Sequence, residues 1–263
     1  MRLVRFAVLP LLLFSHGVVE AAPITKSEIL PRYQVIDPHT DDRKGTPGDF
    51  SFYLLTQEWV QEFCFHQPQL QDCSQPAVTV RKTLGLHGLW PQYKIPDDYP
   101  YNCRNSSGCP DGSVCMLGWS GLEKPTRSFL ESAIPVNAQL LANHEWQKHG
   151  TCSGFNQQGY FETVQKLFDK IGTPEVISDN IGKSLSYDAI QDQYGYRVLL
   201  KCSEDAGLSY LDSIVSCWDK SLNQFACDTT GEENALNSCQ GVTEIWIRQS
   251  VDRVPASENQ LLR

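Results

Sequence analysis

Residues 144–154, HEWQKHGTCSG, form the segment that decides how this chain is interpreted. If residues 144–149 are helical, Glu145, Lys148 and His149 are spaced i, i+3 and i+4 along the helix. A carboxylate, an ammonium and an imidazole then share one helix face. Such a face suits a substrate that carries negative charge.

A second histidine segment, LGLHGLWPQY at residues 84–93, contributes His87. Two histidines can perform acid–base catalysis, because imidazole gains and loses a proton near neutral pH. A lone histidine is more often structural than catalytic, but three histidines with a Glu and a Lys in two compact segments favour a functional site. Trp146 points away from the shared face, so we expect it in the core.

Two other enzyme classes fit this pattern poorly. HEWQKH looks like the HExxH motif of zinc proteases, but His144 and His149 are spaced i and i+5, about 140° apart on a helix, so they cannot both face one metal. The stretch GWSG at residues 118–121 lacks the second spacer of the G-x-S-x-G motif. We therefore predict no metal site, no serine nucleophile and no cofactor.

The N-terminus predicts entry into the secretory pathway. Two early arginines precede an apolar stretch over residues 6–14, and Ala21 and Ala22 offer a cleavage site, so residues 1–21 have the pattern of a signal peptide. The apolar stretch is too short to cross a bilayer, and no later segment is long and apolar enough. We expect a mature protein that is not bound to a membrane and is secreted or retained in a lysosome or vacuole.

Ten cysteines fit an oxidising compartment. None forms a paired CxxC, and the spacing from Cys109 to Cys115 is wider than the usual zinc loop, so disulfides are favoured over metal ligands. The sequon Asn105-Ser106-Ser107 lies in a polar stretch between cysteines. It predicts a surface glycan at Asn105, with an unused sequon as the alternative.

Length and composition predict one globular domain. We expect residues 22–48, rich in proline, to form a loose lead-in, residues 49–250 the domain, and residues 251–263 a tail. The formal net charge of −9 repels nucleic acid, which is itself negatively charged. A nucleic-acid substrate would need a local positive site or an acidic compartment.

Hydrophobic patterning predicts an α+β fold. Residues 51–56 are expected to form a buried strand, and residues 78–86 to lead into a second strand that delivers His87 and ends at Pro91. Residues 96–121 are expected to form a long loop held by disulfides. Residues 128–141 and 158–171 are expected to be helices, and the last third, from Tyr196 onwards, is expected to be mostly strand.

These residue types can cleave RNA. One histidine can remove the proton of a ribose 2′-hydroxyl while the other, as an imidazolium, protonates the departing 5′-oxygen. Lys148 can neutralise charge that builds on the phosphate oxygens, and His144, at i+4 to Lys148, can contact the phosphate. Glu145 can orient its neighbours, take part in proton transfer, or raise the pKa of His149.

The two histidine segments resemble, in the same order, the active-site segments of the ribonuclease T2 family. The resemblance covers most of residues 50–248. It is carried by LHGLWP at residues 86–91, HEWQKHGTC at 144–152, FYLLTQEWVQEFC at 52–64, LSYLDSIVSCWDK at 208–220 and EIWI at 244–247.

The resemblance implies a T2-like fold, with helices packed on a central antiparallel sheet and disulfides as staples. It implies that a monomer cleaves single-stranded RNA, but not DNA, to a 2′,3′-cyclic phosphate and then a 3′-phosphate, without metal. By similarity, His149 is the general base, His87 is the general acid, and Glu145 with Lys148 stabilises the transition state.

Substrate binding is implied for two further residues. His144 would bind phosphate, and Trp90 resembles the aromatic residue that stacks on a base, with core packing as its alternative. Gln92 departs from the acidic residue of some fungal members, so their base preference is not transferred and low base specificity is expected. Residues before Thr46 match nothing that we recognise, and the Cys109–Cys115 segment is not shared by all members.

The family also implies the disulfides. The implied pairs are Cys64–Cys73, Cys103–Cys152, Cys202–Cys239 and Cys217–Cys227, which leaves Cys109–Cys115 as an additional loop bridge.

Two functions from other classes stay open. One is a secreted binding or signalling protein that uses the ribonuclease fold as a scaffold, which fold alone does not exclude. The other is a cysteine-rich inhibitor or storage protein. The complete set of His87, Glu145, Lys148 and His149 favours an enzyme, and the need for one protonated histidine predicts an acidic pH optimum.

Overall fold

The computed structural model of the chain describes the expected domain and little beyond it. The predicted signal peptide, most of the lead-in and the C-terminal tail lie outside the described residues. These residues are 43–94, 98–107, 109, 115–228 and 235–249.

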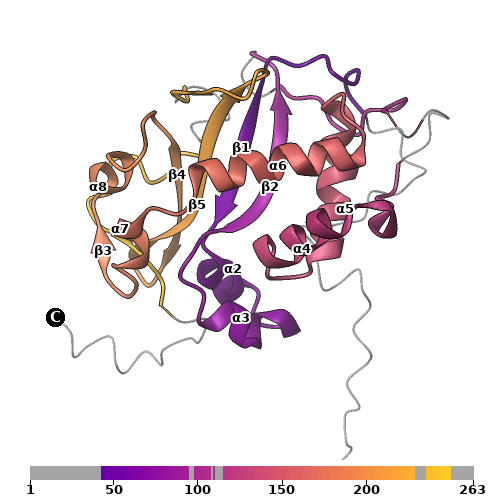
Figure 1. Cartoon of the computed structure of the whole chain (residues 1–263). Coiled ribbons are helices and arrows are strands. Elements are labelled where there is room, and N and C mark those ends of the chain that lie inside the picture. The colour runs from indigo at the N-terminus through magenta and orange to yellow at the C-terminus, as the bar shows by residue number, and fades with distance from the viewer. Residues whose placement is uncertain (1–42, 95–97, 108, 110–114, 229–234, 250–263) are drawn as a thin grey trace, which may run out of the picture.

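The described residues contain a seven-stranded sheet with β5 (Leu208–Asp219) at its centre (Figure 1). β1 (Phe52–Glu58) pairs antiparallel with β5 on one side and with β2 (Gly85–Gln92) on the other. Nearly every residue of β1 is buried, and its sequence FYLLTQE accordingly does not alternate between apolar and polar residues. Its last three residues, Thr56, Gln57 and Glu58, are polar and buried. β2 lies at the end of the strand order.

The last third of the chain completes the sheet, as predicted. β4 (Leu199–Asp205) and β6 (Gln224–Phe225) both pair antiparallel with β5. β7 (Ile245–Trp246) pairs parallel with β5 and antiparallel with β3 (Ser184–Leu185). The α+β class and the central antiparallel sheet are confirmed, and the parallel β5–β7 pair makes the sheet mixed at that edge.

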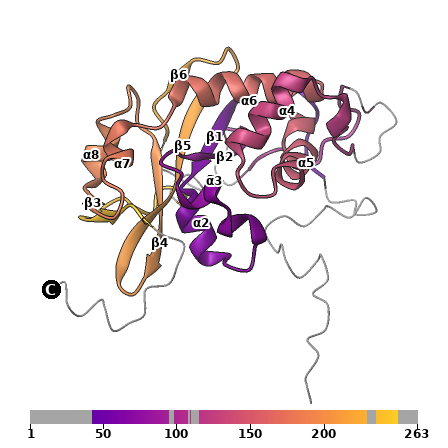
Figure 2. The ribbon, with the colours of Figure 1, turned by 60° about the horizontal axis from the view of Figure 1, so that its bottom comes forward.

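Helices pack on the sheet in two groups, which both views show (Figures 1 and 2). α4 (Lys124–Ala133), α5 (Ala138–Lys148) and α6 (Gln157–Ile171) lie beside β1 and β2 and enclose a large apolar core. Trp146 is fully buried in that core, as predicted. α7 (Glu175–Ser178) and α8 (Tyr187–Gln191) pack a second core against β4, β5 and β7.

Short helical elements complete the described chain. None of its helices combines the length and apolar character that a membrane span requires. The short elements are α2 (Val60–His66), η1 (Gln71–Ser74), α3 (Pro76–Thr79), η2 (Trp119–Gly121) and η3 (Gly150–Cys152).

The helix predicted over residues 128–141 is wrong as a single helix. The chain forms α4 and α5, separated by a break that contains Pro135. Ile134, before the proline, adopts an extended conformation, and Asn137 has a left-handed φ of 51°. A residue before proline is excluded from the helical region by steric clash, which explains the break. The helix predicted over 158–171 is confirmed by α6.

Residues 78–86 lead into the second strand, as predicted: α3 occupies the start of this segment, and β2, which carries His87, begins at Gly85. Pro91 does not end β2, which continues to Gln92. Proline is tolerated in a strand whose N–H side needs no ladder partner. Pro91 lies opposite Tyr53 of β1 and has no strand on its other side in the sheet order.

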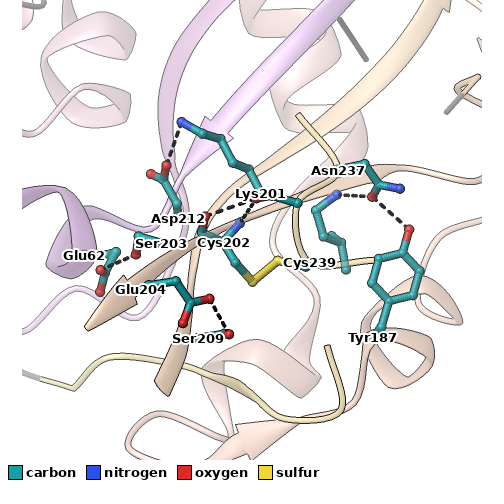
Figure 3. Close-up of a disulfide and its surroundings, with 12 residues drawn as sticks. Glu62, Tyr187, Lys201, Cys202, Ser203, Glu204, Ser209, Asp212, Asn237 and Cys239 are labelled. Atoms are coloured by element: carbon teal, nitrogen blue, oxygen red, sulfur yellow. Dashed lines mark hydrogen bonds and ion pairs between the residues drawn. A yellow bond between two sulfur atoms is a disulfide. The ribbon is translucent and has the colours of Figure 1, made fainter. Parts of the chain in front are cut away.

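Five disulfides staple the fold, and they join the predicted pairs. Figure 3 shows Cys202–Cys239, which ties β4 to the segment before β7. Beside it, Lys201 of β4 forms an ion pair of 2.9 Å with Asp212 of β5. Tyr187 of α8 donates a hydrogen bond of 2.9 Å to the Asn237 side chain. The bridge therefore fixes the strand-rich end of the domain.

Candidate active site

His87 lies at an irregularity in the β1–β2 pairing. Thr56 is opposite Gly88, whereas Gln57 is opposite Leu86, so His87 is the extra residue of a β-bulge. A bulge bends a strand and changes the direction of a side chain. The His87 ring is partly exposed and lies 5.4 Å, between ring centroids, from that of Trp90 on the same strand.

The second histidine segment forms the end of α5. The helix includes His144, Glu145 and Lys148, and His149 is its C-cap, so the predicted helical spacing is confirmed up to Lys148. The Asn102 N–H donates a hydrogen bond of 2.9 Å to the Lys148 carbonyl. The Cys103–Cys152 disulfide joins the two segments that flank this contact, and it thereby fixes the helix end.

Glu145 joins the two histidine segments. Trp90 donates a hydrogen bond of 2.8 Å from its indole N–H to the Glu145 carboxylate, and the His87 Nε2 atom lies 3.7 Å from the other carboxylate oxygen. A Cβ atom on Gly88 would overlap this carboxylate. Glycine at position 88 therefore lets α5 approach β2 closely enough for Glu145 to reach both partners.

Aromatic rings gather at the same point. The Trp90 ring lies 5.3 Å from the His149 ring, so Trp90 contacts both histidines. The indole also packs, partly buried, against the apolar cluster that includes Leu54 and Val215. Trp90 therefore both lies at the site and contributes to core packing, the two alternatives left open by the sequence. Tyr99, in the segment predicted to be a long loop, lies 6.1 Å from the His149 ring, and the Lys148 ammonium is 5.8 Å from the Tyr99 ring centroid.

Burial sets the protonation of the two buried acid–base groups. It raises the pKa of Glu145 from 4.5 to about 7, against the opposing effects of His87 and the Trp90 hydrogen bond. Burial, followed by the charges of Lys148 and His144, lowers the pKa of His149 well below 6.5. The prediction that Glu145 raises the pKa of His149 is therefore wrong, because desolvation of the imidazolium and the neighbouring cations lower that pKa and Glu145 is not among the causes.

Glu58 is the site residue that the sequence analysis missed. It is the last residue of β1, it is buried, and its carboxylate lies 3.1 Å from the His87 Nδ1 atom. His87 therefore lies between two carboxylates, one at each ring nitrogen. The available signal was an acidic residue at the end of a strand that the sequence predicts to be buried.

The remaining predictions concern the surface and metals. Asn105 is exposed, with a left-handed φ of 57°, so a glycan could be attached without displacing core residues. Within the described ranges, no cluster of three or more His, Cys, Asp or Glu residues has a metal-holding arrangement.

Comparisons with known proteins agree with this geometry. The model of the ribonuclease T2 family matches residues 50–239. Ribonuclease 1 of Arabidopsis thaliana is 30% identical over 199 residues, which cover 71% of this chain and 84% of that protein. Intracellular ribonuclease LX of Solanum lycopersicum is 29% identical over 192 residues, or 68% of this chain and 78% of that protein.

A solved structure shares the fold. A mutant of ribonuclease MC1, the bitter gourd seed enzyme, in complex with 5′-UMP has a TM-score of 0.56 at 26% identity, covering 69% of this chain and 96% of that chain. The family match spans well over half of the present sequence. This chain therefore belongs to the ribonuclease T2 family and is an RNA-cleaving enzyme.

Proposed function

We propose that this ribonuclease cleaves single-stranded RNA by attack of the ribose 2′-hydroxyl on the adjacent phosphodiester, with His87 and His149 in opposite proton-transfer roles. The carrying observation is the contrast between their environments. His87 lies 3.1 Å from the Glu58 carboxylate, whose negative charge favours its imidazolium form, and its Nε2 atom lies 3.7 Å from the Glu145 carboxyl group. His149 is buried near cations, and its lowered pKa keeps it neutral in weak acid.

The first step moves two protons. His149 accepts the proton of the 2′-hydroxyl, the 2′-oxygen bonds to phosphorus, and His87 donates its Nε2 proton to the departing 5′-oxygen. The products are a 2′,3′-cyclic phosphate and a free 5′-hydroxyl. In the second step, His87 removes a proton from water, the water oxygen bonds to phosphorus, the bond from phosphorus to the 2′-oxygen breaks, and His149 returns its proton to that oxygen, which gives a 3′-phosphate.

Neighbouring groups stabilise the pentacoordinate phosphorane. Lys148 supplies a positive charge, and we assign His144, one turn earlier on α5, to phosphate binding. Since the pKa of Glu145 is about 7, its carboxyl is largely protonated in acid. A neutral Glu145 does not repel phosphate and can donate a hydrogen bond to it.

The substrate is single-stranded RNA with little base specificity. Trp90 and Tyr99 lie beside the acid–base groups, and aromatic faces accept any base. DNA lacks the 2′-hydroxyl and should resist cleavage. The chain carries a net charge of −9, so attraction of RNA depends on the local cations and improves in acid.

An acidic pH optimum follows from the two histidine roles. Activity is lost as pH falls through the pKa of His149, which must be neutral, and as pH rises through that of His87, which must be protonated. Burial lowers the first pKa well below 6.5, so the working range extends into acid.

We further propose a secretory destination for a monomer whose catalytic domain spans residues 49–250. All cysteines of the described residues are in disulfides, which persist in oxidising compartments. Residues 1–21 have the pattern of a signal peptide, and Asn105 is an exposed glycan acceptor. The final location would be extracellular, lysosomal or vacuolar.

The test uses a short RNA and its all-deoxy analogue, incubated with EDTA from about pH 4 to about pH 8, with the products resolved by mass. We expect cyclic-phosphate ends from RNA alone, and loss of cleavage in the His87→Ala and His149→Ala variants. His66→Ala is the control, because His66 contacts Glu62 outside the site. Absence of cleavage by correctly oxidised protein would contradict the proposal and favour the binding or signalling role.

A further inference from the structure

Glu58 has a fixed position next to the general acid. Its backbone pairs with Gly85 of β2 and Ser213 of β5, so it lies inside the sheet and not on a loop. The next residue, Trp59, is fully buried and donates hydrogen bonds to the Asp212 and Arg248 carbonyls. The Glu58 carboxylate therefore has little freedom to move away from His87.

A buried carboxylate is unfavourable unless it is paired. Glu58 is 6% exposed, and within the described part of the chain its ion pair is with His87 alone. Neither the strand nor the apolar core requires a carboxylate at this position. The contact with the His87 Nδ1 atom is therefore what accounts for an acidic residue at the end of β1.

The contact fixes which ring nitrogen can transfer a proton. An acceptor at Nδ1 holds the Nδ1–H, and it leaves the Nε2 atom directed towards Glu145 and the neighbouring groups of α5. We infer that Glu58 is a positioning residue that holds His87 in the orientation and charge state of a general acid, with Nε2–H as the proton that passes to the leaving 5′-oxygen. This inference rests on the proposed function.

The groups that face His87 give Glu58 a distinct electrostatic role. From α5, Glu145 approaches Nε2, and the Lys148 ammonium and the His149 imidazole lie nearby. The Glu145 carboxyl is largely protonated in acid, since its pKa is about 7. Glu58 is then the anion that balances the imidazolium, comparable to the third group that orients the base in a catalytic triad.

The pH dependence of cleavage tests this inference. Glu58→Gln keeps the shape and a hydrogen-bond partner for Nδ1 but removes the charge. An opposite charge within a few Å shifts a pKa by about 1 unit or more. We expect the alkaline limb of the kcat/KM profile to move down by about 1 pH unit, so kcat/KM falls about tenfold above the limb and changes little below it.

Two further variants complete the design. Glu58→Asp should restore part of the limb position, because it returns the charge at a greater distance. Glu131→Gln, on the exposed side of α4, removes the same charge away from the site and should leave the profile unchanged. A merely structural role for Glu58 would lower kcat/KM equally at every pH, and that outcome would overturn the inference.

A direct measurement separates this inference from the proposed function. Nitrogen-15 NMR of the imidazole reports the proton position and the pKa of His87 without turnover. We expect Nδ1–H to be the neutral tautomer in the parent, and a lower His87 pKa with mixed tautomers in Glu58→Gln. Unchanged titration in the variant would refute the inference even if the parent cleaves RNA. If the parent does not cleave RNA, the NMR result still decides whether the pair exists.

Discussion

Replacing Glu145 with Gln should stabilise the protein at alkaline pH. The carboxyl is 2% exposed, and its pKa rises from 4.5 to about 7 on folding. The folded state therefore binds more protons than the unfolded state between these values, and stability falls as pH rises through them. Each pH unit corresponds to about 1.4 kcal/mol, so ionised Glu145 costs about 3 kcal/mol above pH 7.

The glutamine amide has nearly the same shape, and its oxygen can accept the Trp90 hydrogen bond. We expect Glu145→Gln to gain about 2 kcal/mol relative to the parent between about pH 5 and about pH 8. The lowered pKa of His149 has the opposite pH dependence, but Glu145 is not among its causes, so it cancels in the difference.

Urea unfolding of both proteins at the two pH values measures this difference, with Glu131→Gln as the exposed control. Equal changes in the free energy of unfolding for parent and Glu145→Gln would refute the argument that burial raises the pKa of Glu145.

Two further perturbations test how the site is held. Gly88→Ala should lose about 1–3 kcal/mol of stability in urea unfolding, because its methyl group would overlap the Glu145 carboxylate; Gly121→Ala, where the space is open, should not, and equal losses would contradict this reasoning. Replacing Cys103 and Cys152 together with Ser should cost about 2–5 kcal/mol and lower kcat at temperatures where the variant stays folded, whereas unchanged kcat would show that the bridge does not fix the end of α5.

The part of the site that is formed by residues close together in the sequence was predicted well. The helical spacing from Glu145 to Lys148 is local, so periodicity alone places these residues together at the end of α5. Four of the five disulfides, by contrast, were obtained only through the family resemblance, and Cys109–Cys115 followed from them by elimination. Spacing alone does not determine which cysteines pair.

The missed features depend on contacts between distant segments or on competing local signals. Glu58 is 29 residues from His87, and only the β1–β2 bulge brings them together. Pro135 was visible in the sequence, but the apolar spacing on both sides of it suggested one helix. Pro91 was expected to end its strand, because proline is tolerated inside an edge strand only. That β2 is an edge strand depends on the whole sheet and is not visible in the local sequence.

A DNA oligonucleotide that contains a single ribonucleotide tests the central claim most directly. Attack by a 2′-hydroxyl predicts cleavage only on the 3′ side of that ribose, with a 2′,3′-cyclic phosphate on the upstream product, identified by mass. The same product should accumulate before the 3′-phosphate appears. Cleavage at deoxyribose positions, or a product with a 5′-phosphate, would contradict the roles assigned to His87 and His149.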